Sequence, residues 1–150
     1  MSTLITAELV DLELAGPDRG AATRSLAERL SGAGRVTNLV GFLADVASRE
    51  AQMPTGLEGG IGIPHARSSH VTAPSLAFGR SGDGIDWGAP DGPAHLIFLI
   101  AAPASGDADH MTILAALARR LVHASFREAL SNATDPQQVA ELITREVSGQ

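Results

Sequence analysis

The sequence contains no lysine, no cysteine and no tyrosine, and aromatic residues make up only 3% of it. Without lysine the chain cannot form a Schiff base or supply the lysine of a nucleotide-binding P-loop. Without cysteine it offers no thiol nucleophile, no disulfide and no cysteine zinc site. The scarcity of aromatic rings leaves no platform on which sugar rings or single-stranded nucleic acid could stack. Any chemistry therefore falls to the histidines, the arginines and the carboxylates.

Length and charge indicate a small acidic protein. Its 150 residues fit one domain, so we expect a single domain over residues 1–150, and the net charge of −6 disfavours binding to nucleic acid or anionic lipid. The longest apolar run, Leu96 to Pro103, is far too short to cross a membrane. The first residues lack the basic start and apolar core of a secretory signal. We therefore expect a cytoplasmic protein with no nucleic-acid partner and no direct insertion into a membrane.

Hydrophobic spacing predicts an α/β fold with a central mixed β-sheet and helices packed on both of its faces. The most apolar segment, 95–102, is expected to be a central strand buried on both sides. Further strands are expected at 9–14, within 59–65 and around 76–78, and the glycine-rich segment 81–92 is expected to form turns. Helices are expected from Asp18 to the glycines at 32 and 34, from Leu39 to about Gln52 behind an Asn38 cap, and over 109–124, 125–132 and 136–147.

His65 is the first candidate for a reactive group because of the residues that precede it. Glycines at 59, 60 and 62 remove side chains where the backbone approaches a ligand, and Pro64 fixes the backbone just before the imidazole. Backbone N–H groups in such a turn bind anions, so an imidazole held there could attack phosphorus and keep the product stabilised. The alternative is that His65 merely ends a strand.

His110 stands at the head of an otherwise apolar helix stripe. It precedes Leu114, Leu117 and Leu121 at intervals of four, three and four, so its imidazole is expected to point inward. The positive end of the helix dipole should keep this imidazole neutral. The alternative is a core histidine that is bonded to a backbone carbonyl.

Arg49 interrupts the corresponding stripe of the preceding helix. Phe42, Val46 and Met53 share its face, so the guanidinium needs a partner, and a bound phosphoryl group would serve as well as a carboxylate. The alternative is an arginine that reaches the last carbonyl groups of its own helix.

The other histidines carry weaker signals. His70, His95 and His123 are expected to be structural or solvated, and no H-E-x-x-H or similar ligand spacing predicts a metal site. The chain also lacks the third glycine of a dinucleotide fingerprint and the register of a serine nucleophile elbow. We therefore expect neither a metal nor a cofactor.

The segment from Gly60 to Ala66 reads GIGIPHA and resembles a known family. The chain is similar to enzyme IIA components of the fructose/mannitol type in the bacterial phosphoenolpyruvate-dependent sugar phosphotransferase system. The matching motifs follow the family's order from about Leu4 to Val147. They are Arg49-Glu50, Thr55-Gly56-Leu57, Leu76 to Arg80, Gly84 to Trp87, His95 to Pro103 and His110 to Arg119.

This resemblance implies a phosphocarrier. His65 would accept a phosphoryl group from the phosphohistidine of the carrier HPr and pass it to a cysteine of an enzyme IIB domain, serving the membrane component IIC indirectly. His110 and Arg49 match the second active-site histidine and the active-site arginine of the family. In the family Nε2 is phosphorylated, whereas the spacing here selects neither nitrogen. The pocket for the phosphoryl group is expected to include Thr55, Glu58, Ile63 and Pro64.

The resemblance leaves two functional classes open. Sugar uptake, most closely that of fructose, is the first expectation because the motifs after His65 are most similar to fructose-type members. The alternative is a regulatory protein of the nitrogen-related branch, which acts by phosphorylation-dependent binding of partners and uses the same histidine. A degenerate domain without chemistry is disfavoured by the intact His65, His110 and Arg49. Two departures are that Gly62 replaces the commoner alanine, which is expected to loosen the strand before His65, and that Met111 replaces the commoner leucine.

Overall fold

The computed structural model contains one mixed β-sheet. It describes residues 4–14, 16, 18–52, 55–57, 59–89, 91–104 and 109–147, except for the side chains of 109–111. Within these residues the strand order is β1-β5-β6-β3-β2, and β4 pairs with β6 beside this path. The strands are β1 (Val10–Asp11), β2 (Gly56–Leu57), β3 (Ile61–Gly62), β4 (His65–Ser68), β5 (Ser75–Ile85) and β6 (Ala94–Pro103).

The central strand is β6, as the apolar run 95–102 predicts. It pairs antiparallel with β5 along one edge and parallel with β3 and then β4 along the other. Its residues from Leu96 to Ala102 are all buried, because helices cover both faces of the sheet. The register places His65, the first residue of β4, opposite Ile100.

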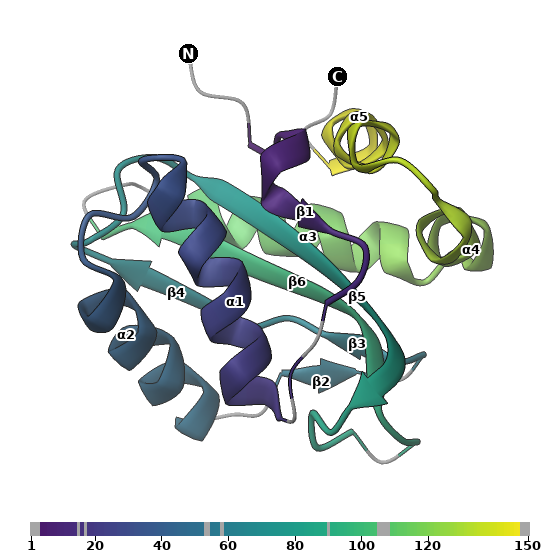
Figure 1. Ribbon diagram of the computed structural model, residues 1–150, viewed down its shortest axis with the longest axis horizontal. Helices are drawn as coiled ribbons and strands as arrows, with labels where there is room; N and C mark the ends of the chain where they lie inside the picture. Colours follow the sequence, from purple (N-terminus) through teal and green to yellow (C-terminus); the bar gives the residue numbers. More distant parts are fainter. Residues whose placement is uncertain are drawn as a thin grey trace.

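The helices form a layer on each face of the sheet. Helices α1 (Arg19–Gly32) and α2 (Leu39–Gln52) lie in front of it in Figure 1, and α3 (Asp109–Leu121) lies behind it. Helices α4 (Ala124–Asn132) and α5 (Pro136–Val147) pack beside α3, and α5 also contacts β1 and the short helix η1 (Ala7–Leu9). The predicted α/β class with helices on both faces is therefore confirmed.

The predicted helix ends agree closely with the structure. Asp18 caps α1 by accepting a hydrogen bond from Ala21 N at 2.8 Å, and Asn38 accepts one from Gly41 N at 3.1 Å. The last helix spans Pro136–Val147 as predicted. The prediction for 109–124 was three residues too long, because α3 ends at Leu121 and His123 precedes α4 as its N-cap.

Three strand predictions need correction. The predicted strand 9–14 contracts to β1, because η1 already occupies 7–9. The predicted turns at 81–92 begin only after Ile85, because a bulge after Arg80 lets Ile85 pair again with Ala94. The predicted strand within 59–65 is two strands, β3 and β4, separated by Ile63 and Pro64. Strand β2 was not predicted, and its two residues carry no alternating pattern.

Candidate active site

His65 lies at the start of β4, where the strand passes beneath α2. Only 8% of the residue is exposed. Its Nδ1 lies 2.8 Å from the carbonyl oxygen of Ile63. Since a carbonyl oxygen can only accept a hydrogen bond, the proton of the neutral imidazole is on Nδ1, and Nε2 carries the lone pair. The structure thus distinguishes two nitrogens that the sequence spacing does not.

Arg49 faces this lone pair from the last turn of α2. Its Nε donates a hydrogen bond to Nε2 of His65 at 3.3 Å. The guanidinium is partly buried, and it forms no ion pair with any described residue. Arg49 therefore lies on an apolar stripe because its guanidinium bonds to the imidazole of His65. No carboxylate of the described residues neutralises the positive charge of Arg49.

A cavity of about 300 Å³ opens beside these two side chains. Arg67 lines it as well, two residues along β4 from His65, and donates a hydrogen bond to Ala104 O at 2.9 Å. The acidic residue in the lining, Asp45, already accepts a 2.6 Å hydrogen bond from Ser68 Oγ. The cavity thus combines an imidazole with two guanidinium groups, which is a setting suited to an anion. Ser48, Gln52 and Ala66 complete its lining.

Sequence reasoning did not identify Arg67. The signal was present, because residues two apart on a strand face the same side of the sheet, so Arg67 follows His65 in a period of two. Ser48 and Gln52 also escaped notice, since they are ordinary polar residues on the exposed face of α2 until β4 is placed beside them.

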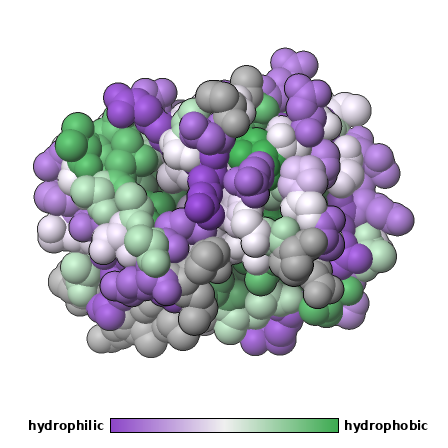
Figure 2. All heavy atoms as spheres, turned by 90° about the horizontal axis from the view of Figure 1, so that it is seen from below, coloured by the Kyte–Doolittle hydropathy of each residue, from purple (hydrophilic) through white to green (hydrophobic). Residues whose placement is uncertain are grey.

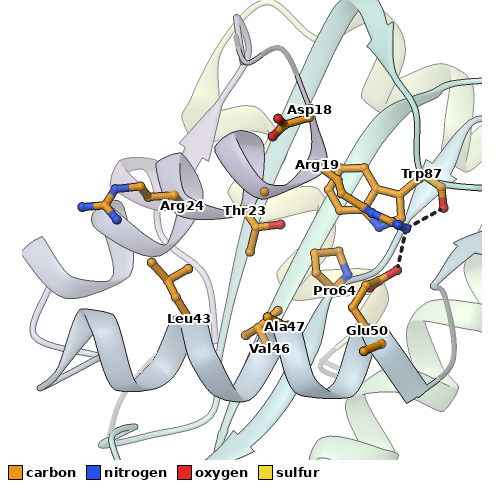
Figure 3. A pocket seen from close by; sticks show the side chains of 12 residues that line it. Asp18, Arg19, Thr23, Arg24, Leu43, Val46, Ala47, Glu50, Pro64 and Trp87 are labelled. Carbon is orange, nitrogen blue, oxygen red and sulfur yellow. Dashed lines mark hydrogen bonds and ion pairs between the residues drawn. The ribbon is translucent and has the colours of Figure 1, made fainter.

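Thr55 and Glu50 form a polar clasp on the side of α2 that faces away from the cavity at His65; Figure 3 shows the Glu50 side chain and its ion pair with Arg19. Glu50 Oε2 accepts a hydrogen bond from Thr55 N at 2.8 Å, and Glu50 Oε1 accepts one from the Thr55 hydroxyl at 2.6 Å. Trp87 Nε1 donates to the same hydroxyl at 3.1 Å, and Arg19 forms an ion pair with Glu50 at 3.3 Å. Thr55 O in turn accepts from Ile63 N at 3.1 Å. The clasp therefore ties the end of α2 to the segment that leads to His65.

The other predicted pocket residues occupy different positions. Ile63 contributes the carbonyl group that orients His65, whereas Pro64 lines a second cavity on the opposite side of α2. Glu58 lies outside the described residues, and so does Met53. His110 lies in the first turn of α3, and its side chain is likewise outside the described structure.

The glycines before His65 serve the backbone and its packing. Gly59 and Gly60 have φ values of 95° and 77°, which side chains disfavour, and they form the turn into β3. Gly59 N donates to Asp91 at 2.9 Å, so this amide is already used by a carboxylate. A Cβ at Gly62 would lie 2.7 Å from the Trp87 ring. We expected Gly62 to loosen the strand before His65, but this glycine instead packs closely against the indole ring of Trp87.

His70, His95 and His123 do not line the cavity beside His65. His95 is exposed, and its Nδ1 is 2.8 Å from Ser81 O. His70 packs near Gly41, and His123 is exposed at the N-cap of α4.

Among the residues with described side chains, no three His, Asp or Glu groups gather closely enough to hold a metal ion. None of the helices in the described part of the chain combines the length and the apolar character that a bilayer crossing requires.

Comparison with known proteins shows which family the chain belongs to. The family model described as "Phosphoenolpyruvate-dependent sugar phosphotransferase system, EIIA 2" matches residues 3–146. A "PTS system fructose-specific EIIA component" from Haloferax volcanii is 40% identical over 148 residues, covering 98% of this chain and 96% of that protein. A "PTS system fructose-specific EIIABC component" from Bacillus subtilis is 31% identical over 146 residues, which cover 97% of this chain and 23% of that longer protein.

Solved structures agree with the fold. The crystal structure of IIA mannitol from Escherichia coli superposes with a TM-score of 0.78 at 26% identity, covering 93% of this chain and 98% of that one. The nitrogen regulatory protein IIA-Ntr from Neisseria meningitidis superposes with a TM-score of 0.85 at 24% identity over 93% of this chain and 96% of that one, which is a likeness of fold. The chain belongs to the EIIA type 2 family of the phosphoenolpyruvate-dependent sugar phosphotransferase system.

Proposed function

We propose that the chain is a phosphocarrier that takes a phosphoryl group onto Nε2 of His65 from the phosphohistidine of HPr and passes it to a cysteine of an enzyme IIB domain. The observation that carries this proposal is the pair of contacts on the His65 ring. Nδ1 is held by Ile63 O, and Nε2 faces Arg49 at the edge of a cavity. A nucleophile needs an available lone pair, and Nε2 carries it; the arriving phosphoryl group displaces the 3.3 Å bond from Arg49, whose N–H group then turns to a phosphoryl oxygen.

The proposed reaction is an in-line exchange between two nucleophiles. Nε2 of His65 attacks phosphorus, a new N–P bond forms, and the N–P bond to the donor imidazole breaks as its electron pair returns to the donor. The proton on Nδ1 of His65 stays in place, and the Ile63 carbonyl stabilises the positive charge that the ring gains. In the second step a cysteine thiolate attacks phosphorus, and Nε2 recovers its electron pair. No water takes part in either step.

Arg49 supports the proposal by its charge and its position. The phosphoryl group carries negative charge on its oxygens, and a guanidinium that lacks a carboxylate partner in the described structure can offset it. In the unphosphorylated protein its N–H bonds to Nε2, the same atom that is to be phosphorylated. We assign to His110, in the first turn of α3, a hydrogen bond to the phosphoryl group or to His65, as the family resemblance implies.

Fructose uptake is the function we assign to this phosphocarrier. The Haloferax and Bacillus relatives are both named fructose-specific, and the former matches this chain along almost its whole length. A IIB acceptor is supported by the mannitol-type IIA of Escherichia coli, which has been solved in complex with phosphorylated IIB and is 24% identical to this chain. The nitrogen-type regulatory function is the competing possibility, and transfer to a sugar-specific IIB domain distinguishes the two.

The test is the intact mass of the protein after incubation with phosphoenolpyruvate, enzyme I and HPr, with each carrier omitted in turn. We expect a gain of about one phosphoryl group, labile in acid and mapped to His65, that requires both carriers. His65→Ala should keep its far-UV circular dichroism and gain no mass. Addition of a fructose-specific IIB domain should then discharge the phosphorylated protein. Normal phosphorylation of the His65→Ala variant would refute the assignment of the site, and failure to discharge onto IIB would favour the regulatory function.

A further inference from the structure

A second cavity of about 660 Å³ lies between α1 and α2 (Figure 3). It shares no lining residue with the cavity beside His65, and α2 separates the two. Its apolar lining includes Leu43 and Val46 of α2, the ring of Pro64 and the buried indole of Trp87. Figure 2 views the molecule from below, and it shows hydrophobic side chains gathered at the left, on the side where α2 lies in Figure 1. The size and the apolar lining are those of cavities that bind small molecules.

Thr23 gives this cavity an unused polar group. The residue is 8% exposed, lines the cavity from the side of α1 that faces α2, and has no hydrogen-bond partner among the described residues. Among the described residues, Thr6 has the fully enclosed side-chain oxygen that lacks a partner; the Thr23 hydroxyl is not enclosed in this way and opens onto the cavity. A nearly buried hydroxyl without a protein partner is costly unless another molecule bonds to it.

Arg19 supplies the charge at the mouth of the cavity. Its Nη1 contacts Glu50 at 3.3 Å and Trp87 O at 3.5 Å, while its other N–H groups bond to no described residue, and 44% of the side chain is exposed. The nearby acids are already engaged, because Glu50 holds Thr55 with both oxygens and Asp18 caps α1. Arg24, which also lines the cavity, pairs with Glu28 at 3.3 Å. The outer guanidinium edge of Arg19 and the Thr23 hydroxyl are therefore two groups that can donate hydrogen bonds to a ligand.

We infer that this cavity binds a small carboxylate with an apolar body. The carboxylate meets the outer edge of Arg19 and accepts a hydrogen bond from the Thr23 hydroxyl, and the apolar body lies against Leu43, Val46 and Pro64. A dianionic phosphate fits less well, because Glu50 beside Arg19 repels it and the remaining lining is largely apolar. The inference does not depend on the proposed phosphotransfer, because it uses none of the residues that line the cavity at His65.

The chain's single tryptophan, Trp87, is buried in the wall of the cavity, so its fluorescence is the signal used to follow occupancy. The probe is 4-methylpentanoate, with 4-methylpentanamide as the uncharged control and acetate as the control without an apolar body. We expect a saturable change in Trp87 fluorescence with 4-methylpentanoate, with a dissociation constant on the order of 1 mM, as for a small fragment. Both controls should bind at least tenfold more weakly.

Variants locate the binding. Thr23→Val keeps the shape and removes the hydroxyl, and it should weaken 4-methylpentanoate binding about fivefold or more, as loss of one hydrogen bond to a charged group predicts. Arg67→Gln, in the other cavity, should bind the probe unchanged. Absence of saturation, equal binding of the amide, or equal binding by Thr23→Val would each overturn the inference. Thermal unfolding of every variant without ligand checks that the fold is retained, and 4-methylpentanoate should raise the melting temperature of the wild type and of Arg67→Gln.

Discussion

Arg49 supplies positive charge at Nε2 of His65, the atom proposed to be phosphorylated. It stands at the end of α2 with its Nε on the imidazole of His65. Arg49→Gln should lower the single-turnover rate of phosphoryl transfer from HPr by about 100-fold, since loss of one preorganised group that stabilises transition-state charge has an effect of this size. Rapid-quench measurement with excess phosphorylated HPr gives the rate. Arg145→Gln removes an exposed arginine of α5 and should transfer at the wild-type rate; equal rates for the two variants would exclude Arg49 from the reaction.

Glu50 follows Arg49 in the sequence, but the side chains of these two residues lie on opposite sides of α2. Its carboxylate accepts bonds from Thr55 N, the Thr55 hydroxyl and Arg19. Glu50→Ala leaves these donors without their partner, so we expect the free energy of unfolding to fall by about 1–3 kcal/mol in urea titration. Glu141→Ala, on exposed α5, is the matched control and should stay within about 0.5 kcal/mol of the wild type. Equal stability of the two variants would show that the clasp contributes nothing to folding.

The spacing of residues singled out the proposed reactive groups, but it did not indicate the hydrogen-bond partners around them. Arg49 and His65 stood out because a charge interrupted an apolar stripe and an imidazole followed a Gly-Pro segment. The bond from Trp87 to Thr55 joins residues 32 positions apart, and the bond from Arg19 to Glu50 joins residues 31 apart. Contacts at such separations follow from the packing of whole elements, so no local pattern could have indicated the clasp. The protonated nitrogen of His65 likewise depends on where Ile63 turns its carbonyl group.

Strand β3 is held by the fit of one glycine against one indole. A Cβ at Gly62 would meet Trp87 at 2.7 Å, whereas Gly32, at the end of α1, has nothing within 4 Å and needs no positive φ. Gly62→Ala should therefore lose about 1–3 kcal/mol through overpacking and shift the Trp87 emission. Gly32→Ala should be neutral or gain up to about 1 kcal/mol, because alanine lowers the entropy of the unfolded chain. Urea titration followed by fluorescence compares the two, and a stable Gly62→Ala protein with unchanged emission would contradict the packing described.

The elements themselves differ in how far their sequences determine them. Helices α1, α2 and α5 could be bounded from apolar spacing and caps such as Asp18 and Asn38, since both signals are local. Strand β5 could not, because its continuation to Ile85 depends on pairing with Ala94 across a bulge. β2 and β3 are each two residues long and exist through their partners, so sequence alone offers too few residues for a period of two to be seen.

At the scale of the whole molecule, one core joins the two helical layers. The buried cluster includes Leu26 of α1 and Ile143 of α5, on opposite sides of the sheet, together with Trp87. This continuity supports the expectation of one cooperative domain. The cavity at His65 is lined by residues of α2 and β4, and the role proposed for His110 would add α3. A core of this kind transmits a local loss of packing to every element that it contains.

The corresponding prediction concerns unfolding in urea. Ile143→Ala empties space in α5, where the side chain is fully buried, and should lower the free energy of unfolding by about 2–5 kcal/mol. If the molecule unfolds as one unit, Trp87 fluorescence and far-UV circular dichroism give the same midpoint in the wild type, and both midpoints fall together in Ile143→Ala and in Leu26→Ala. A midpoint of Trp87 that stays in place while the helical signal moves would show that α5 unfolds separately. The active site would then rest on a smaller cooperative unit built from α1, α2 and the sheet.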